Sequence, residues 1–562
     1  MKPLNLLVER ADERRLISEN FRDIVHKSYA SNPDYRESAP GVPENFNKIK
    51  TLEELLSVNY KHVSVNDQLR GNLLLKLRQK KFPYSGIIGY DDDIVPSINR
   101  AILSYHDILL VGQIGQAKTK IAETIAKNLL SPIPIIEGSI TNDIPTLIPE
   151  NELISLLEDR EVIRARPEFY VSTETEDKIR NNRLDTKIVW LDGPSRFKYL
   201  LATPDISVKD LVGQIDAIKI AKKGVEIYNI ESYSPGQLLL ARHGVFCIDE
   251  LPVLDPRKQV ALLSVLQEGI YTTGSYPVIF KPDTRIISTA NPIDYTHSGK
   301  IIEPLYDRLK SHIVTRYPKN VYDEMRIMIQ EANIPNRQNV VLPIFVLRTL
   351  AEITRTARSH PEINQEKGVS VRMSIHSLEI LIAEAERVRN VDNNITTVPR
   401  FSDIYSIRQT AKFELSEIDD SYENRMNILD NIISDSIKKA CSFYLVEIPP
   451  ERLINIKNEF KINKTFFVSQ DITGNSNTPK SYHSQLNKFN SLSEIIKIVN
   501  NNIIQDQKNF EEKFGDMTTG ADQHDSTKDP EYLASITELI LEGLRFTDPP
   551  ILDRKEGIYV RR

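Results

Sequence analysis

A glycine-rich loop at residues 112–119 has the residue types and spacing of a phosphate-binding site. It nearly matches the pattern G-x-x-x-x-G-K-[ST], in which backbone N–H groups and a lysine bind phosphates and a hydroxyl binds Mg²⁺. Lys118 would reach the β- and γ-phosphates, and the Thr119 hydroxyl would bind the metal. The candidate phosphate-binding residues are Gly112, Gln113, Ile114, Gly115, Gln116, Ala117, Lys118 and Thr119.

The second glycine of the pattern is replaced by Ala117, which would open the helix after the loop. If the backbone at this position is right-handed, alanine favours the helix by roughly 1 kcal/mol over glycine. We therefore expect the substitution to leave the site intact. The alternative is a chance glycine-rich turn before a helix.

An apolar run ending in two carboxylates lies about 130 residues further on, in "GVFCIDELPVL". Such a pair is costly unless it emerges at the carboxyl edge of a sheet, where ligands bind in open α/β folds. Asp249 would hold the Mg²⁺ shell, and Glu250 would orient and deprotonate an attacking water. An ordinary strand followed by an acidic helix cap is the alternative.

Three further residues could assist transfer of a phosphoryl group. Asn291 ends the strand-like "RIISTANP" and could hold the attacking water, although it could also be a turn-forming residue before a proline. Arg308 could neutralise developing charge in its own site or in that of a neighbouring subunit, or could pair with a nearby aspartate. Arg372 opens a predicted helix and could fold over the phosphates as a lid closes.

The elements that must position these residues alternate between β-branched runs and helical patterns over residues 83–318. This alternation predicts an α/β fold with a parallel five-stranded sheet and helices on both faces. The expected strands are Ile108–Val111, Ile133–Glu137, Tyr199–Ala202, Gly244–Ile248 and Arg285–Thr289.

Composition divides the rest of the chain. We expect a helical N-terminal region at 1–82, an insertion at 145–195 within the core, a helical lid at 319–395 and a helical extension at 396–463. The Asn-, Ser- and Lys-rich residues 464–530 predict a flexible linker, followed by a helix and tail at 531–562.

Together these motifs resemble the AAA+ ATPases, and among them the ATPase subunit of magnesium chelatase. The resemblance covers about 83–390 and includes "FPYSGIIGYDDD", "ATPDISVKDLVGQIDAIKIAKKG" and "YSPGQLLLARHGVFCIDELPVLDPRKQVALLSVLQEG". "GIYTTGSYPVIFKPDTRIISTANP" is similar to the hairpin and following strand of that subunit. Alanine at the position of Ala117 is common in the related MoxR-type ATPases and MCM helicases.

This resemblance implies ATP and Mg²⁺ as ligands, a ring that is most often a hexamer, and hydrolysis that moves a partner protein. It carries an ATP site onto Gly112–Thr119, Asp249, Glu250, Asn291, Arg308 and Arg372. Two features depart from the chelatase pattern. Glu303 stands where an arginine is usual, and the stretch between Pro318 and Arg372 is short.

The favoured interpretation is therefore an ATPase of the chelatase or MoxR type that remodels a partner, which could carry a von Willebrand A domain. True magnesium insertion into a porphyrin and a non-hydrolysing nucleotide-bound scaffold are the alternatives. A σ54-type transcription activator would need a G-A-F-T-G-A-like loop, and "DISVKDLVGQIDAIK" lacks one.

The overall composition bears on the partners and the cellular location of the protein. The net charge of −6 over 562 residues makes nucleic acid an unlikely partner, and no apolar run is long enough to predict a membrane span. The two cysteines, Cys247 and Cys441, form neither a disulfide framework nor a zinc motif. We expect a reducing, cytoplasmic location.

Overall fold

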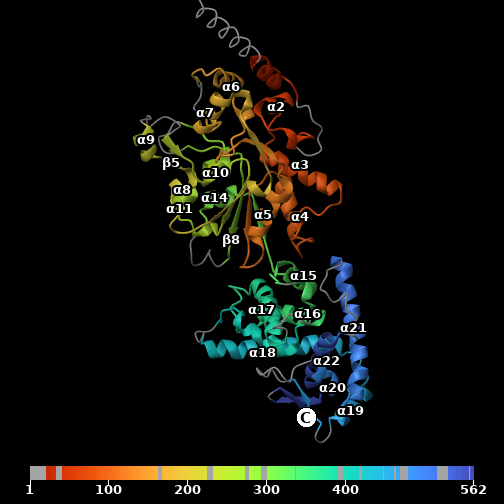
Figure 1. Cartoon of the computed structure of the whole chain (residues 1–562). Coiled ribbons are helices and arrows are strands. Elements are labelled where there is room, and N and C mark those ends of the chain that lie inside the picture. The colour runs from red at the N-terminus through yellow and green to blue at the C-terminus, as the bar shows by residue number, and fades with distance from the viewer. Residues whose placement is uncertain are drawn as a thin grey trace, which may run out of the picture. The chain divides into compact units, whose positions relative to one another are not determined.

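The computed structural model divides the chain into two compact units, Met1–Gly112 with Ala117–Thr315 and Gln113–Gln116 with Arg316–Arg562 (Figure 1). Within the described part of the chain, no helix combines the length and the apolar character needed to cross a bilayer. The structure describes residues 21–32, 41–162, 168–223, 232–272, 278–292, 300–335, 337–389, 396–416, 421–446, 448–460, 464–468, 479–515, 529–555 and 557–562.

A five-stranded parallel sheet forms the centre of the first unit, which confirms the predicted fold class. Its strand order is β4-β7-β8-β1-β9, so that β1 lies between β8 and β9. The strands are β1 (Ile108–Val111), β4 (Phe197–Leu201), β7 (Val245–Asp249), β8 (Arg285–Ala290) and β9 (Ser311–Val314).

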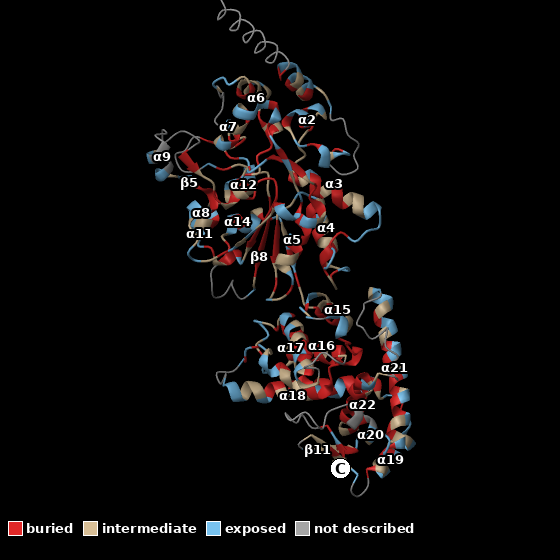
Figure 2. Cartoon of the chain, viewed as in Figure 1, coloured by how far each residue is buried: buried red, intermediate tan, exposed pale blue. Residues whose placement is uncertain are grey.

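Both faces at the centre of this sheet are buried, because successive side chains of β1, β7 and β8 enter different hydrophobic cores (Figure 2). On β7, Val245 and Cys247 face one core, and Phe246 and Ile248 face the other. This arrangement explains why the strand is an uninterrupted apolar run. The first core is covered by α3 (Val65–Arg78), α4 (Ile94–Leu103) and α5 (Lys118–Leu129), and the second by α8 (Val208–Val212), α10 (Gln237–Leu240), α12 (Leu263–Glu268) and α14 (Glu303–Arg308).

The prediction that all five expected strands belong to this sheet was wrong for one of them. The run at Ile133–Glu137 forms β2 (Ile133–Ile136), which pairs antiparallel with β3 (Ile188–Leu191) in a separate two-stranded sheet. The fifth strand of the main sheet is instead β9, at "SHIV", where only Ile313 is buried and Val314 is 71% exposed. An edge strand with so little burial carries a weak apolar signal.

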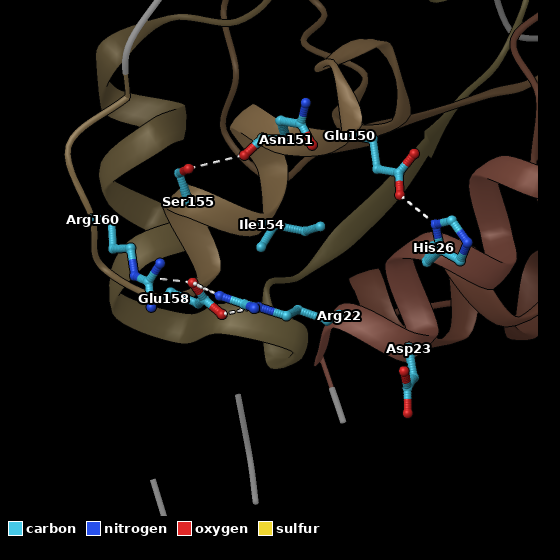
Figure 3. A pocket seen from close by; sticks show the side chains of 9 residues that line it. All are labelled: Arg22, Asp23, His26, Glu150, Asn151, Ile154, Ser155, Glu158 and Arg160. Atoms are coloured by element: carbon cyan, nitrogen blue, oxygen red, sulfur yellow. Dashed lines mark hydrogen bonds and ion pairs between the residues drawn. The ribbon is translucent and has the colours of Figure 1, made fainter. Parts of the chain in front are cut away.

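The stretch expected as an insertion, 145–195, folds with β2 around a core of its own. It contributes β3, α6 (Glu150–Leu157) and α7 (Thr173–Asn182), which pack with α2 (Leu52–Ser57). A pocket of about 440 Å³ opens between the helical residues 21–30 and α6 (Figure 3). Its central carboxylate, Glu158, is paired with Arg22 at 2.6 Å and Arg160 at 3.0 Å, so its charge is already compensated within the protein.

The second unit has one continuous hydrophobic core that runs from Met325 to Tyr559. The expected lid at 319–395 and the later helices therefore share a single core rather than forming separate ones. A three-stranded sheet, β10-β12-β11, completes the unit. The helices are α15 (Val321–Glu331), α16 (Ile344–Ser359), α17 (Arg372–Arg389), α18 (Tyr422–Tyr444), α19 (Pro450–Glu459), α20 (Pro479–Leu486), α21 (Asn490–Phe514) and α22 (Pro530–Arg545), and the strands are β10 (Phe466–Phe467), β11 (Leu552–Lys555) and β12 (Ile558–Arg561).

The predicted linker at 464–530 was wrong over its described part, because α21 is a 25-residue helix. Its buried residues recur at helical spacing, and they include Leu492, Ile495, Val499 and Ile503. The opposite face carries the Asn, Lys and Gln residues that make the composition polar. The helical spacing of the apolar residues is therefore a better guide to this segment than its polar composition. Residues 469–478 and 516–528 of the predicted linker lie outside the described residues.

Buried ion pairs hold α22 in the second unit. Glu531, Glu538 and Glu542 lie along one face of the helix and are almost completely buried. Arg400, itself 1% exposed, donates to Glu531 at 2.6 Å, and Arg554 donates to Glu542 at 2.7 Å. Each carboxylate compensates a charge that would otherwise be costly to bury.

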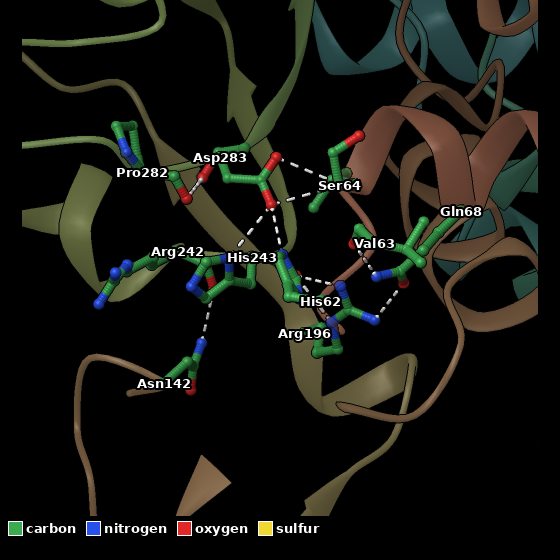
Figure 4. Close-up of polar contacts among 12 residues, drawn as sticks. His62, Val63, Ser64, Gln68, Asn142, Arg196, Arg242, His243, Pro282 and Asp283 are labelled. Atoms are coloured by element: carbon green, nitrogen blue, oxygen red, sulfur yellow. Dashed lines mark hydrogen bonds and ion pairs between the residues drawn. The ribbon is translucent and has the colours of Figure 1, made fainter. Parts of the chain in front are cut away.

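A buried polar junction in the first unit is centred on Asp283 (Figure 4). Its carboxylate contacts His62 Nε2 at 2.9 Å and His243 Nδ1 at 3.1 Å, and it accepts a hydrogen bond from the Val65 backbone. Burial alone would raise the pKa of Asp283, but the hydrogen bonds from His243 and His62 outweigh it and lower that pKa. Burial, together with the charge of Arg242, lowers the pKa of His243 well below 6.5.

The three side chains offer ligand atoms within 4.8 Å of one another, which is also ligand chemistry for zinc. Zinc-bound histidines almost always donate their other ring N–H to a partner. Within the part of the chain that the structure describes, His62 Nδ1 and His243 Nε2 have no such partner, and the positive charge of Arg242 acts on His243. The geometry therefore favours a hydrogen-bonded junction that joins the segment before α3 to the ends of the sheet.

We predict that this junction makes the first unit less stable as the pH falls from about 7.5 to about 5.5. His243 is neutral when folded but gains a proton in the unfolded chain below pH 6.5, so its contribution is present above that pH and is lost below it. His243→Asn keeps a donor near the Nδ1 position and suits the left-handed φ of 60° at this residue. Thermal unfolding should show a shallower loss of Tm with acid in this variant.

His26→Asn is the matched control, because the His26 side chain is 75% exposed. It should show the same loss of Tm with acid as the unsubstituted protein. An equally steep loss in His243→Asn would contradict this interpretation of the junction.

Candidate active site

The candidate phosphate loop joins β1 to α5 at the carboxyl edge of the main sheet. Helix α5 begins at Lys118, so the loop N–H groups and the positive end of the helix dipole meet there. Gly115 (φ +78°) and Ala117 (φ 55°, ψ 22°) both have left-handed backbones. Turns with residues of this hand form concave nests of N–H groups that bind anions.

The conformation of Ala117 corrects the expectation of a right-handed backbone at this position. A left-handed conformation costs a non-glycine residue about 1–2 kcal/mol, which glycine would not incur. Alanine is therefore accommodated against the local preference, rather than because the position is helical.

Lys118 and Thr119 are the first two residues of α5, directly after the loop. The Lys118 ammonium group donates to the carbonyl oxygen of Gly112, at the start of the loop. The Thr119 hydroxyl donates to Asp249 Oδ2 at 3.1 Å. Asp249 is the last residue of β7, so the loop and the acidic strand end, 130 residues apart in sequence, meet in one place.

Two residues that the sequence patterns did not single out also bind the Asp249 carboxylate. The Tyr199 hydroxyl, from the edge strand β4, donates to Oδ2 at 3.0 Å. The Thr289 hydroxyl, from β8, donates to Oδ1. Burial and the charge of Asp249 raise the pKa of Tyr199 to about 12, so this hydroxyl keeps its proton at neutral pH. Hydroxyl groups from three elements thus surround one carboxylate.

Glu250 follows directly and has a left-handed backbone, with φ 56° and ψ 44°. Its N–H donates to the Thr289 hydroxyl at 3.0 Å. Such a conformation costs about 1–3 kcal/mol in a non-glycine residue and is typical of functional sites. Asn291 follows the end of β8, and the carbonyl of its neighbour Ala290 accepts from Gly112 N at 3.0 Å. The acidic pair, Asn291 and the loop therefore share the same sheet edge.

The two candidate arginines lie in other surroundings. Arg308 ends α14, and its guanidinium donates to Gln267 Oε1 and to the carbonyl of Pro304 at 2.9 Å. Arg372 begins α17 in the second unit and is exposed. Their predicted roles stay predictions.

Residues Gln113–Gln116 of the loop group with the second unit. Within that unit, the Gln113 amide donates to the carbonyls of Gln365 and Glu366, the latter at 3.1 Å. The Tyr317 hydroxyl donates to the carbonyl of Ile114 at 2.9 Å. These bonds use the Gln113 side chain and the Ile114 carbonyl of the loop.

The donor set fits a nucleoside triphosphate with Mg²⁺. The left-handed turn, the start of α5 and Lys118 supply positive charge for phosphates. Thr119 and Asp249 supply the hydroxyl and carboxylate oxygens that Mg²⁺ prefers, and they already lie 3.1 Å apart. Glu250 and Asn291 directly follow the ends of the neighbouring strands β7 and β8.

A family model and a curated relative each match part of the chain. The family described as Sigma-54 interaction domain matches residues 229–315, which contain the acidic strand end and Asn291. The stretch that lacks a G-A-F-T-G-A-like loop, at 205–219, lies outside this match. An uncharacterized protein, YeaC of Bacillus subtilis (strain 168), is 25% identical over 202 residues, which cover 32% of this chain and 58% of YeaC. The match therefore spans a little over half the length of this curated relative.

Solved structures with a similar arrangement include the complex of subunits BchI and BchD of magnesium chelatase, at 15% identity and a TM-score of 0.31. The similarity covers 61% of this chain and 98% of that one. NtrX from Brucella abortus in complex with ADP is 14% identical with a TM-score of 0.33, and covers 66% of each chain. At these scores the two structures add no argument of their own.

We predict that Ala117→Gly raises the free energy of unfolding by up to about 1 kcal/mol. Glycine relieves the strain of the left-handed backbone, and this gain more than offsets the greater conformational entropy of glycine in the unfolded chain. Ala122→Gly is the matched control in the same helix. Ala122 is fully buried inside α5, so this variant should lose about 1 kcal/mol or more. Denaturant unfolding measures both; equal losses in the two variants would contradict the left-handed loop.

Proposed function

We propose that this chain is an ATPase of the AAA+ type, which binds ATP with Mg²⁺ and hydrolyses the nucleotide at the edge of its five-stranded sheet. The observation that supports this most directly is the contact between Thr119 and Asp249, with Lys118 on the adjoining turn. It joins a phosphate loop and an acidic strand end, the two parts that hold the phosphates and Mg²⁺ in P-loop ATPases.

Each residue then has a distinct task. Lys118 and the loop N–H groups bind the β- and γ-phosphates, and Thr119 and Asp249 hold Mg²⁺, which neutralises charge on the phosphates. Glu250 accepts a proton from the attacking water. Asn291 orients this water through its amide. The strained backbone of Glu250 sets the direction of its carboxylate.

We further propose that the ATPase works as a ring in which Arg308 serves the site of a neighbouring subunit. The motivation is its position at the end of α14, where it bonds to Gln267 rather than to any phosphate-loop residue. An arginine supplied in trans stabilises charge that develops during phosphoryl transfer.

The work done by this ring is proposed to be remodelling of a partner protein, on the basis of the sequence resemblance to MoxR-type and chelatase ATPases. A protein with a von Willebrand A domain is the candidate partner. A neighbouring gene for such a protein would support remodelling, whereas neighbouring porphyrin-pathway genes would favour metal insertion instead.

We predict that Glu250→Gln binds ATP but hydrolyses it at least about 100-fold more slowly, because the amide cannot accept the proton of water. Lys118→Ala should lose nucleotide binding as well, and Lys120→Ala, two residues along the same helix, should lose neither. Turnover is followed by phosphate release, and binding by a fluorescent ATP analogue. Unimpaired turnover in Glu250→Gln would rule out the assignment.

Mixing variants tests the action of Arg308 in trans. Glu250→Gln and Arg308→Ala should each be inactive alone, but a mixed ring pairs an intact Glu250 with an intact Arg308 at about a quarter of its interfaces. Phosphate release should therefore partly return on mixing. Glu250→Gln mixed with Lys118→Ala, both defective in the same site, should stay inactive. No recovery in the first mixture would show that Arg308 does not act across the interface.

A further inference from the structure

Thr289 occupies a position between the two carboxylate residues of the proposed site. It is the fifth residue of β8 and is fully buried. Its hydroxyl donates to Asp249 Oδ1 and accepts from the backbone N–H of Glu250 at 3.0 Å. One hydroxyl has a single proton to donate and lone pairs to accept, so both bonds can exist at once.

The sheet register explains this placement. Strands β7 and β8 are parallel neighbours, with Ile248 opposite Ser288. The next residue on each strand is Asp249 and Thr289, at the point where β7 ends and the chain turns through the left-handed Glu250. A short hydroxyl side chain at this register can reach the carboxylate of one residue and the backbone of the next.

The hydroxyl groups around Asp249 contact different oxygens of its carboxylate. Thr289 takes Oδ1, whereas Thr119 and Tyr199 approach Oδ2 at 3.1 Å and 3.0 Å. The carboxylate plane is thus held from one side, and Oδ2 stays toward the Thr119 hydroxyl, the expected metal ligand. The same hydroxyl bonds the N–H of the left-handed Glu250.

We propose that Thr289 is a positioning residue that couples the metal-binding carboxylate of Asp249 to the backbone of the base Glu250. This inference rests on the proposed ATP hydrolysis at the same site. Thr289 touches neither phosphate nor water in this assignment. It fixes the orientation of the Asp249 carboxylate, which would bind Mg²⁺, and the backbone turn that directs the Glu250 side chain. A shift of the Asp249 carboxylate is therefore transmitted to Glu250, and a shift of Glu250 to Asp249.

Thr289→Val is the decisive variant, since valine keeps the shape of threonine and removes only the hydroxyl. We expect kcat for ATP to fall by roughly 10–100-fold and the Mg²⁺ concentration for half-maximal activity to rise by about 10-fold, the usual range for residues that support a metal ligand. The KM for ATP should change by less than about threefold, because the phosphate loop is untouched. Thr289→Ser restores the hydroxyl and should recover activity to within about threefold of the unsubstituted protein.

Thr315→Val is the matched control. Thr315 is also buried and follows β9 of the same sheet, but its hydroxyl bonds to the carbonyl of Val111 rather than to the acidic pair. It should leave kcat and the Mg²⁺ dependence unchanged even if the Tm falls. Thermal unfolding of all three variants separates a loss of stability from a loss of positioning.

The possible results are distinct. If Thr289→Val lowers only the Tm, or if Thr289→Ser fails to recover, the proposal is overturned. If the unsubstituted protein binds ATP without turnover, the proposed hydrolysis fails, and Thr289 is judged by binding of a fluorescent ATP analogue in Mg²⁺ and in EDTA. If Thr289→Val binds the analogue equally well in Mg²⁺ and in EDTA, the loss of Mg²⁺-dependent binding supports the coupling of Thr289 to Asp249. If the variant still binds more tightly in Mg²⁺, as the unsubstituted protein does, the coupling is overturned. Absence of any nucleotide binding overturns both proposals.

Discussion

The carboxylate of Asp249 is the constraint around which the site is built. A strand buried on both faces ends in this charge, and a charge at such a position needs hydrogen-bond donors. Hydroxyl groups from the phosphate helix and from both neighbouring strands supply them. The order of strands in the sheet, with β7 between β4 and β8, is what brings these donors to one carboxylate.

Two non-glycine residues at this edge, Ala117 and Glu250, have left-handed backbones, which are individually unfavourable. Ala117 directly precedes α5, and Glu250 directly follows β7. In the proposed site, the first would shape the N–H nest for phosphates, and the second would aim a carboxylate at the attacking water. Local strain in both cases is offset by packing of the sheet beneath, with cores on its two faces.

Local sequence patterns predicted much of the fold and of the candidate site. The features that they missed depend on contacts between strands that are distant in sequence. The phosphate loop, the acidic pair and four of the main strands have short apolar or motif signals, because each lies in one continuous segment. Thr289 and Tyr199 were missed because their importance comes from strand neighbours, and their types are unremarkable within a strand. Strand β9 was missed because an exposed edge has few apolar residues, and β2 was misplaced because an apolar run does not identify its pairing partner. Helix α21 was obscured by its polar face.

The buried ion pairs of α22 also bear on how the chain folds as it is synthesised. The first unit has every strand of its main sheet once residue 314 has emerged, but the core of the second unit includes Tyr559. At ribosomal rates of roughly 5–20 residues per second, the second unit lags by on the order of ten to fifty seconds. Once Arg400 and α18 have emerged, they lack the helix that packs against them until α22 follows. The second unit is thus the part of the nascent chain that depends most on protection from aggregation.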